Sequence, residues 1–95
     1  MHFGVYRFEG EPAALLAGYE RLLSTIPSDQ LLLHVCVERP GAIEVYDACP
    51  TIEAFEAFAA SREFRDAVEG AGLPRPSVTR LGDVRAAFVQ GKRVG

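Results

Sequence analysis

The stretch from Ala42 to Pro74, AIEVYDACPTIEAFEAFAASREFRDAVEGAGLP, decides the fold of this chain. It opens with a short strand and then passes Thr51, a residue type that often caps the start of a helix. Apolar side chains recur after Thr51 at helical spacing and share one face, which predicts that this face packs against a sheet. The residues on that face are Phe55, Phe58, Phe64 and Val68. The stretch is therefore half of a sandwich of helices and strands.

A second capping residue, Ser61, interrupts the helical run. It predicts either a kink or a second short helix that continues through Glu69. Gly70 and Gly72 then end the helical segment, because glycine favours the left-handed conformation found just after many helices.

The flanking residues supply the remaining elements. They predict a strand over His2–Phe8, a helix over about 12–25 that starts at Pro12 and is ended by Pro27-Ser28-Asp29, a strand over Leu31–Glu38, and a last strand over Ser77–Val89 with a bulge at Gly82. The order βαββαβ predicts an α+β, ferredoxin-like sandwich, a four-stranded antiparallel sheet with two helices on one face. We expect residues 1–90 to form a single domain and residues 91–95 a short polar tail.

The length of the turn between the second and third strands decides which side chains share a face. This turn lies within residues 39–42. An even turn of two or four residues sets His34 opposite Asp47. It also mixes the apolar side chains of the second strand with Glu44.

An odd turn of three or five residues, with a bulge near Gly41, keeps the apolar side chains of both strands together. We expect this odd turn. The side chains that then face the helices are those of Val35, Val37, Ile43 and Val45. Those on the open face of the sheet are His34, Cys36, Glu44 and Tyr46, with Tyr6 and Leu32 beside them.

The composition excludes several classes of protein. Of the 95 residues, 48% are hydrophobic and 24% are charged, and the net charge of −3 gives no general attraction to nucleic acid or to anionic membranes. No stretch approaches the roughly 18 apolar residues of a membrane span, so we expect a cytoplasmic protein without a membrane partner. Cys36 and Cys49 lack the spacing of metal ligands, so we expect reduced thiols and no metal site.

Helices can cover only one face of the sheet. The open face measures about 300 to 350 Å², estimated from four strands about 4.8 Å apart and five residues at about 3.4 Å each. Together with the apolar last strand, which contains Ala86-Ala87-Phe88-Val89, this area is near the largest patch that a monomer usually exposes. The simplest explanation is that a partner protein buries this apolar surface.

The segment VYDACPTIEAFEAFAASREFRDAV, followed by Gly72-Leu73-Pro74, resembles the strand, acidic-aromatic helix and S-x-E-F turn of the dimeric α/β-barrel superfamily. This group includes antibiotic-biosynthesis monooxygenase-like domains and stress-responsive barrel proteins. The resemblance implies a homodimer whose two sheets enclose a cavity, with the last strand reaching toward the partner. Family members bind aromatic or polyketide-like molecules, haem or lactones. Residues 52–69 lack the histidine that ligates haem in haem-degrading members, and the tryptophan frequent in quinone-forming members is absent.

His34 is the candidate catalytic residue, because imidazole can take a proton from an acidic phenol or an activated carbon near neutral pH. An ordinary strand histidine bonded to a neighbour fits the same position. Tyr6 and Tyr46 are candidates for binding a substrate oxygen, although packing at a dimer interface gives the same pattern. Glu44 can orient His34, and Cys36 can line the site or serve as a small buried hydrophobe.

These features predict a homodimer with an internal cleft for a small hydrophobic or aromatic metabolite, acting as a cofactor-independent monooxygenase. The alternative is a non-enzymatic ligand-binding or assembly module whose barrel is filled by side chains. RNA-recognition domains share the topology, but they need a basic, aromatic third strand. The third strand here has one aromatic residue and two acids, so we expect no nucleic-acid partner.

Overall fold

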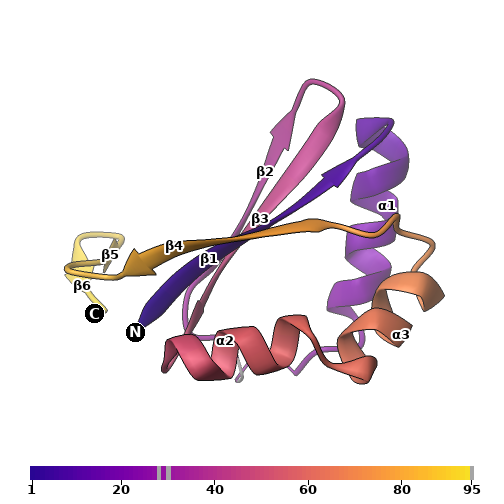
Figure 1. Cartoon of the computed structure of the whole chain (residues 1–95). Coiled ribbons are helices and arrows are strands. Elements are labelled where there is room, and N and C mark those ends of the chain that lie inside the picture. The colour runs from indigo at the N-terminus through magenta and orange to yellow at the C-terminus, as the bar shows by residue number, and fades with distance from the viewer. Residues whose placement is uncertain (28, 30, 95) are drawn as a thin grey trace.

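The computed structural model describes residues 1–27, 29 and 31–94 and has a four-stranded antiparallel sheet with helices on one side (Figure 1). The strands are β1 (His2–Glu9), β2 (His34–Arg39), β3 (Ala42–Cys49) and β4 (Ser77–Asp83), in the spatial order β2-β3-β1-β4. The helices are α1 (Pro12–Leu23), α2 (Ile52–Ala59) and α3 (Arg62–Gly70). The predicted α+β, ferredoxin-like class is confirmed, with three helices in place of the expected two.

The helix boundaries follow the capping residues of the sequence. Pro12 opens α1, and Glu11 caps it by accepting a hydrogen bond from the amide of Ala13 at 3.4 Å. The helix ends at Leu23, slightly earlier than predicted, and Ser28 of the predicted stop lies outside the described residues.

Two serine and threonine caps divide the second helical segment. Thr51 accepts a hydrogen bond from the amide of Ala54 at 3.1 Å at the start of α2. Ser61 accepts one from the amide of Phe64, also at 3.1 Å, at the start of α3. Of the two alternatives for Ser61, the second short helix is therefore confirmed.

The core lies between the helices and β1 and β3. Phe55 is 1% exposed, and its ring occupies the space above Gly4, where an added Cβ would lie 2.2 Å from a ring carbon. Glycine is thus required at this position for close packing of α2 on the sheet. Phe64 and Val68 are buried as predicted. Phe58 is 40% exposed, so the prediction that it belongs to the core was wrong.

The predicted register of the β2–β3 hairpin was also wrong. Arg39 pairs with Ala42, which leaves a two-residue turn at Pro40 and Gly41. Gly41 has a φ of +70°, and proline followed by glycine of positive φ is the pattern of a type II turn, which needs no bulge. His34 therefore lies opposite Asp47.

This register reverses the expected faces of β2. His34 and Cys36 point to the helix side, because Cys36 pairs with Val45, which is buried beneath the helices. Tyr6 also faces the helices and is 3% exposed. The open face instead carries Val35 and Val37 of β2, 45% and 37% exposed, together with Glu44 and Tyr46 of β3.

The C-terminal segment differs from the single predicted strand. The predicted bulge is confirmed, since Phe3 pairs with Gly82 and Gly4 pairs with Arg80, which leaves Leu81 as the extra residue beside Gly82. Beyond β4, two further strands, β5 (Phe88–Val89) and β6 (Lys92–Arg93), form a small hairpin that extends away from α1 and α3 (Figure 1). Lys92 and Arg93 are therefore paired, where we expected a polar tail, and Gly95 lies outside the described residues.

No helix in the described part of the chain is both long enough and apolar enough to cross a membrane.

Candidate functional site

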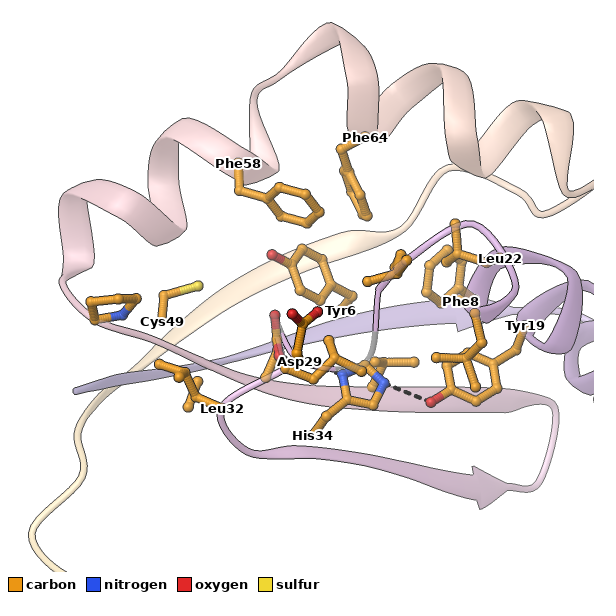
Figure 2. A pocket seen from close by; sticks show the side chains of 17 residues that line it. Tyr6, Phe8, Tyr19, Leu22, Asp29, Leu32, His34, Cys49, Phe58 and Phe64 are labelled. Atoms are coloured by element: carbon orange, nitrogen blue, oxygen red, sulfur yellow. Dashed lines mark hydrogen bonds and ion pairs between the residues drawn. The ribbon is translucent and has the colours of Figure 1, made fainter. Parts of the chain in front are cut away.

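A cavity of about 400 Å³ lies between the helix side of the sheet and the three helices (Figure 2). Its lining is mainly apolar and includes Phe8, Leu22, Ile26, Val45, Phe58 and Phe64. Besides the Cys49 thiol, five polar side chains line it, namely Tyr6 of β1, Tyr19 of α1, His34 of β2, Asp47 of β3 and Asp29 of the segment between α1 and β2. The cavity is therefore an apolar space with a few polar groups at fixed places, which is the usual character of a small-molecule site.

His34 is hydrogen-bonded through both ring nitrogens. The Tyr19 hydroxyl lies 2.6 Å from Nε2, and Asp47 Oδ1 lies 3.4 Å from Nδ1. The rings of Tyr19 and His34 are nearly parallel, with centroids 5.9 Å apart. The Tyr19–His34–Asp47 series, as we call these three residues, joins α1 to the β2–β3 hairpin across one wall of the cavity.

The protons of the series can be assigned from the surroundings of Tyr19. Burial raises the pKa of Tyr19 from 10 to about 12, and the nearby Cys36, Glu20 and Asp47 add to the increase. The phenol therefore keeps its proton, and it donates a hydrogen bond to His34 Nε2 in the tautomer whose ring proton is on Nδ1. The neutral imidazole then carries its own proton on Nδ1, where it can donate to the Asp47 carboxylate.

Tyr6 contributes a second polar group. Its hydroxyl is buried and has no hydrogen-bond partner among the described residues. Burial, and then the charges of Asp47 and Cys49, raise its pKa further above the ordinary value than that of Tyr19, so the hydroxyl is a neutral donor. A buried hydroxyl without a partner is uncommon, because it loses its hydrogen bonds to water on folding and forms none within the protein.

The two cysteines are poor nucleophiles. Cys36 packs against the hydrophobic core on the side of His34, and Cys49 lines the cavity. Burial raises the pKa of both thiols, with Glu20 adding to the shift at Cys36 and Asp47 at Cys49. Both thiols are free, and they favour the protonated form, which is unreactive.

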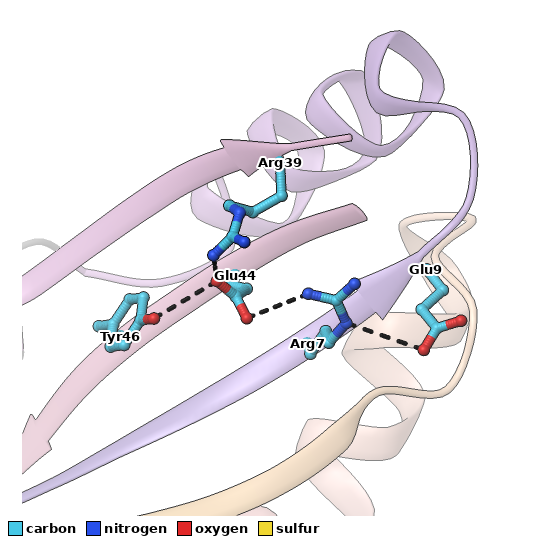
Figure 3. A network of polar contacts seen from close by, with 5 residues as sticks. All are labelled: Arg7, Glu9, Arg39, Glu44 and Tyr46. Atoms are coloured by element: carbon cyan, nitrogen blue, oxygen red, sulfur yellow. Dashed lines mark hydrogen bonds and ion pairs between the residues drawn. The ribbon is translucent and has the colours of Figure 1, made fainter. Parts of the chain in front are cut away.

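Glu44 and Tyr46 lie on the opposite face, so the prediction that they share a face with His34 was wrong. Glu44 binds Arg7 Nη1 through Oε2 and Arg39 Nη1 through Oε1, both at 3.1 Å (Figure 3). The Tyr46 hydroxyl donates to Glu44 Oε1 at 3.4 Å, and Glu9 lies 3.8 Å from Arg7 Nε. Because the sheet separates these groups from the cavity, they take no part in the site.

Sequence reasoning thus found His34 and Tyr6 but missed Tyr19 and Asp47. Asp47 could have been found, since the even turn sets it opposite His34. Tyr19 gave no signal, because it lies in the apolar stripe of α1 and reads as a core residue. In the described part of the chain, no three His, Cys, Asp or Glu side chains cluster as a metal site requires.

The chain is a ferredoxin-like domain with an apolar cavity between its helices and its sheet. No protein-family model and no curated protein matches the sequence. Two solved structures match the fold. A "putative antibiotic biosynthesis monooxygenase" from Deinococcus radiodurans covers 96% of this chain and all of its own, with a TM-score of 0.64 and 14% identity.

A protein of the same description from Chloroflexus aurantiacus covers all of both chains, with a TM-score of 0.60 and 17% identity. At these sequence identities, the similarity shows a shared fold and nothing more. The ferredoxin-like fold implied by the resemblance to antibiotic-biosynthesis monooxygenase-like proteins is therefore confirmed.

Proposed function

We propose that this protein binds a small hydrophobic or aromatic metabolite in the cavity between its helices and its sheet and oxidises it as a cofactor-independent monooxygenase. The observation that carries the proposal is that His34, a proton acceptor, and Tyr6, a donor without a partner among the described residues, line the same apolar cavity. The cavity volume of about 400 Å³ is within the range typical of small-molecule sites, roughly 300 to 1,000 Å³. The description of the two structural neighbours as monooxygenases is consistent with this activity.

The chemistry needs an activated carbon, such as a methylene group next to an aromatic ketone. The methylene loses one proton to the Tyr19–His34–Asp47 series, in which His34 is the final base, and Tyr6 donates a hydrogen bond to the ketone oxygen, where the negative charge gathers. The carbanion transfers electrons to O₂ and forms a hydroperoxide, which loses water. The net reaction converts CH₂ and O₂ into C=O and H₂O, so no external reductant is consumed.

Tyr6 is reached when the ligand displaces Phe58. Phe58 lies next to Tyr6 in the lining and is 40% exposed, so it can move without opening the buried core (Figure 2). The acceptor oxygen of the ligand then satisfies the Tyr6 hydroxyl. This contact favours ligands that carry a carbonyl or phenolate oxygen over plain hydrocarbons of the same size.

The proposal includes a homodimer formed through the open face of the sheet. The more apolar face of β2 is the one turned away from the helices, where Val35 and Val37 are exposed. A standard interface buries about 800 Å² of each partner, more than twice our estimate for the open face, so the β5–β6 hairpin must contribute. Phe88 and Val89 of this hairpin are 61% and 48% exposed. The two free thiols suit a reducing compartment, and we place the dimer in the cytoplasm.

The test uses anthrone, a three-ring ketone with an acidic methylene, as a probe. The wild-type protein should bind anthrone and speed its conversion by O₂ into anthraquinone, measured by absorbance with oxygen uptake. Tyr6→Phe removes only the hydroxyl. It should weaken anthrone binding about 3- to 10-fold and raise the free energy of unfolding of the unliganded protein by about 1 kcal/mol, since a buried donor without a partner is removed.

A Tyr6→Phe variant that binds anthrone as tightly as the wild type would contradict this role of Tyr6. A matched pair of ligands provides the control, because anthracene has three rings without the ketone oxygen. Its binding should be the same in the wild type and the variant.

The second candidate is a non-enzymatic ligand-binding or assembly module with a side-chain-filled barrel. The contacts among Arg7, Glu44, Arg39 and Tyr46 favour it, since these side chains occupy the open face themselves. A wild-type dimer that neither binds nor oxidises anthrone supports this second candidate.

A further inference from the structure

We propose that Tyr19, and not His34, is the group that takes the proton from the bound ligand. In the same step His34 accepts the hydroxyl proton of Tyr19, and Asp47 holds the imidazole of His34 in place. This inference rests on the proposed function and names the proton path of the same cavity. It makes Tyr19 the catalytic residue, and His34 and Asp47 positioning residues behind it.

The geometry of His34 carries the inference. Its side chain is 15% exposed, and each ring nitrogen already has a partner, Tyr19 at Nε2 and Asp47 at Nδ1. A neutral imidazole has one lone pair that can accept a proton. With the ring proton on Nδ1 toward Asp47, that lone pair is on Nε2 and faces the Tyr19 hydroxyl, whose oxygen lies 2.6 Å away. No ring nitrogen is left to meet a ligand. A ligand in the cavity therefore reaches the lone pair of His34 only through the Tyr19 hydroxyl.

The Tyr19 oxygen can pass a proton on without ionising. It accepts the proton of the ligand carbon with a lone pair while its own O–H proton moves to His34 Nε2. The electron pair of the C–H bond stays on the carbon, Tyr19 is neutral before and after, and His34 becomes an imidazolium. The Asp47 carboxylate, 3.4 Å from Nδ1, stabilises the new positive charge. The raised pKa of Tyr19 agrees with a phenol that does not ionise.

A purely structural role for the series makes a different prediction. The Tyr19–His34 hydrogen bond also ties α1 to the sheet, and the His34–Asp47 contact joins β2 to β3, so the loss of either should lower stability in either case. If His34 were a direct base, however, removal of the Tyr19 hydroxyl would free Nε2 and leave proton transfer equal or faster. The relay predicts the opposite result.

The experiment measures exchange of the methylene protons of anthrone with D₂O by NMR under nitrogen, so that proton removal is seen without oxidation. Tyr19→Phe and His34→Gln should each slow the protein-catalysed exchange about 100-fold or more, since general-base catalysis typically contributes about 10²- to 10⁴-fold. Asp47→Asn should slow it as well. Anthrone affinity should stay within about threefold in all three, as these groups act on the proton and contribute little to apolar binding.

The control is Tyr46→Phe, which removes the same hydroxyl from the opposite face of the sheet. It should leave the exchange rate unchanged. Thermal unfolding of each variant checks that the variant is folded. The amide oxygen introduced by His34→Gln can still accept a hydrogen bond from Tyr19, so this variant separates the basicity of His34 from its hydrogen bonding.

Exchange that is as fast in Tyr19→Phe as in the wild type overturns the relay alone. Exchange that is unaffected in folded His34→Gln does the same. A wild-type protein that leaves exchange at the rate of buffer overturns both the relay and the proposed function.

Discussion

The two faces of the sheet each carry a connected set of polar side chains, in opposite surroundings. On the helix side, Tyr19, His34 and Asp47 border an apolar cavity, and Tyr19 is only 7% exposed. On the open side, Glu44 lies between two arginines, of which Arg39 is 54% exposed in its side chain (Figure 3). The first set joins a phenol, an imidazole and one carboxyl group beside an apolar space. The second is a charged surface network.

The difference shows that the number of polar contacts on a face does not indicate whether that face carries a reactive site. Ion pairs beside water are screened and contribute little energy, whereas hydrogen bonds beside an apolar space are stronger and hold their partners in fixed positions. The pKa of Tyr19 is raised to about 12 on the helix side, which reflects this water-poor environment. The helix side is therefore the face on which a reaction can be controlled.

The largest expected effect comes from filling the packing space on the helix side. Gly4→Ala places a Cβ 2.2 Å from the ring of Phe55, which must shift and carry α2 with it. We expect the free energy of unfolding to fall by about 1 to 3 kcal/mol, the usual cost of overpacking, as measured by urea denaturation.

Gly70→Ala is the matched control for this change. At Gly70, apart from its two chain neighbours and the backbone of its own helix, no atom of the described residues lies within 4 Å of the position that the added methyl would take, and the residue ends a helix. Stability should therefore change by less than about 0.5 kcal/mol or increase slightly. Equal losses in both variants would mean that close packing at Gly4 is not the reason for its glycine.

The next effect tests which face forms the dimer. Val35 and Val78 lie on the two edge strands and are similarly exposed, at 45% and 42%. Val35 faces the open side, and Val78, opposite Tyr6, faces the helix side. Val35→Lys should raise the dissociation constant of the dimer tenfold or more, about 1.4 kcal/mol, because it buries a charge in the interface.

Val78→Lys should leave dimerisation unchanged. Sedimentation velocity at micromolar concentrations measures both variants. A wild-type protein that sediments as a monomer there, or equal weakening by the two substitutions, would show that the open face does not form the interface.

The smallest effect concerns the network on the open face. In dilute protein, where the protomers are separate, Glu44→Gln should lower the free energy of unfolding by less than about 1 kcal/mol. The loss should shrink further in about 1 M salt, where the Debye length is about 3 Å. Asp47→Asn provides the contrast, since the loss of unfolding free energy that it causes should depend little on salt. Equal salt dependence would remove the distinction between the two networks.

Much of the fold could be predicted from local signals. Thr51 and Ser61 cap the two helices as expected, and the stripe of Phe55, Phe64 and Val68 packs on the sheet. These features depend on neighbours within a few residues along the chain, so the sequence contains the necessary information. Phe58 has the same spacing but borders a cavity, and no local signal distinguishes an empty space from a filled one.

The site was only partly predictable, because it depends on one turn. We expected an odd turn at Gly41, which would have put the apolar side chains of β2 beneath the helices. The Pro40-Gly41 turn has two residues, and this single difference in parity sends His34 to the opposite face. The error arose from the assumption that the more apolar face of a strand always faces the helices, which fails where a second protein surface can cover the sheet.

By itself, the sequence determined the βαββαβ order of the main elements and the class of fold, though not the β5–β6 hairpin, since capping, periodicity and turn residues act over short distances. Only the tertiary structure decided which candidates meet. Tyr6, Tyr19, His34 and Asp47 come from four elements, and their convergence depends on strand register and helix packing, to which residues far apart in the chain contribute together. Glu44 and Tyr46, adjacent in sequence to this group, were separated from it by the thickness of one sheet.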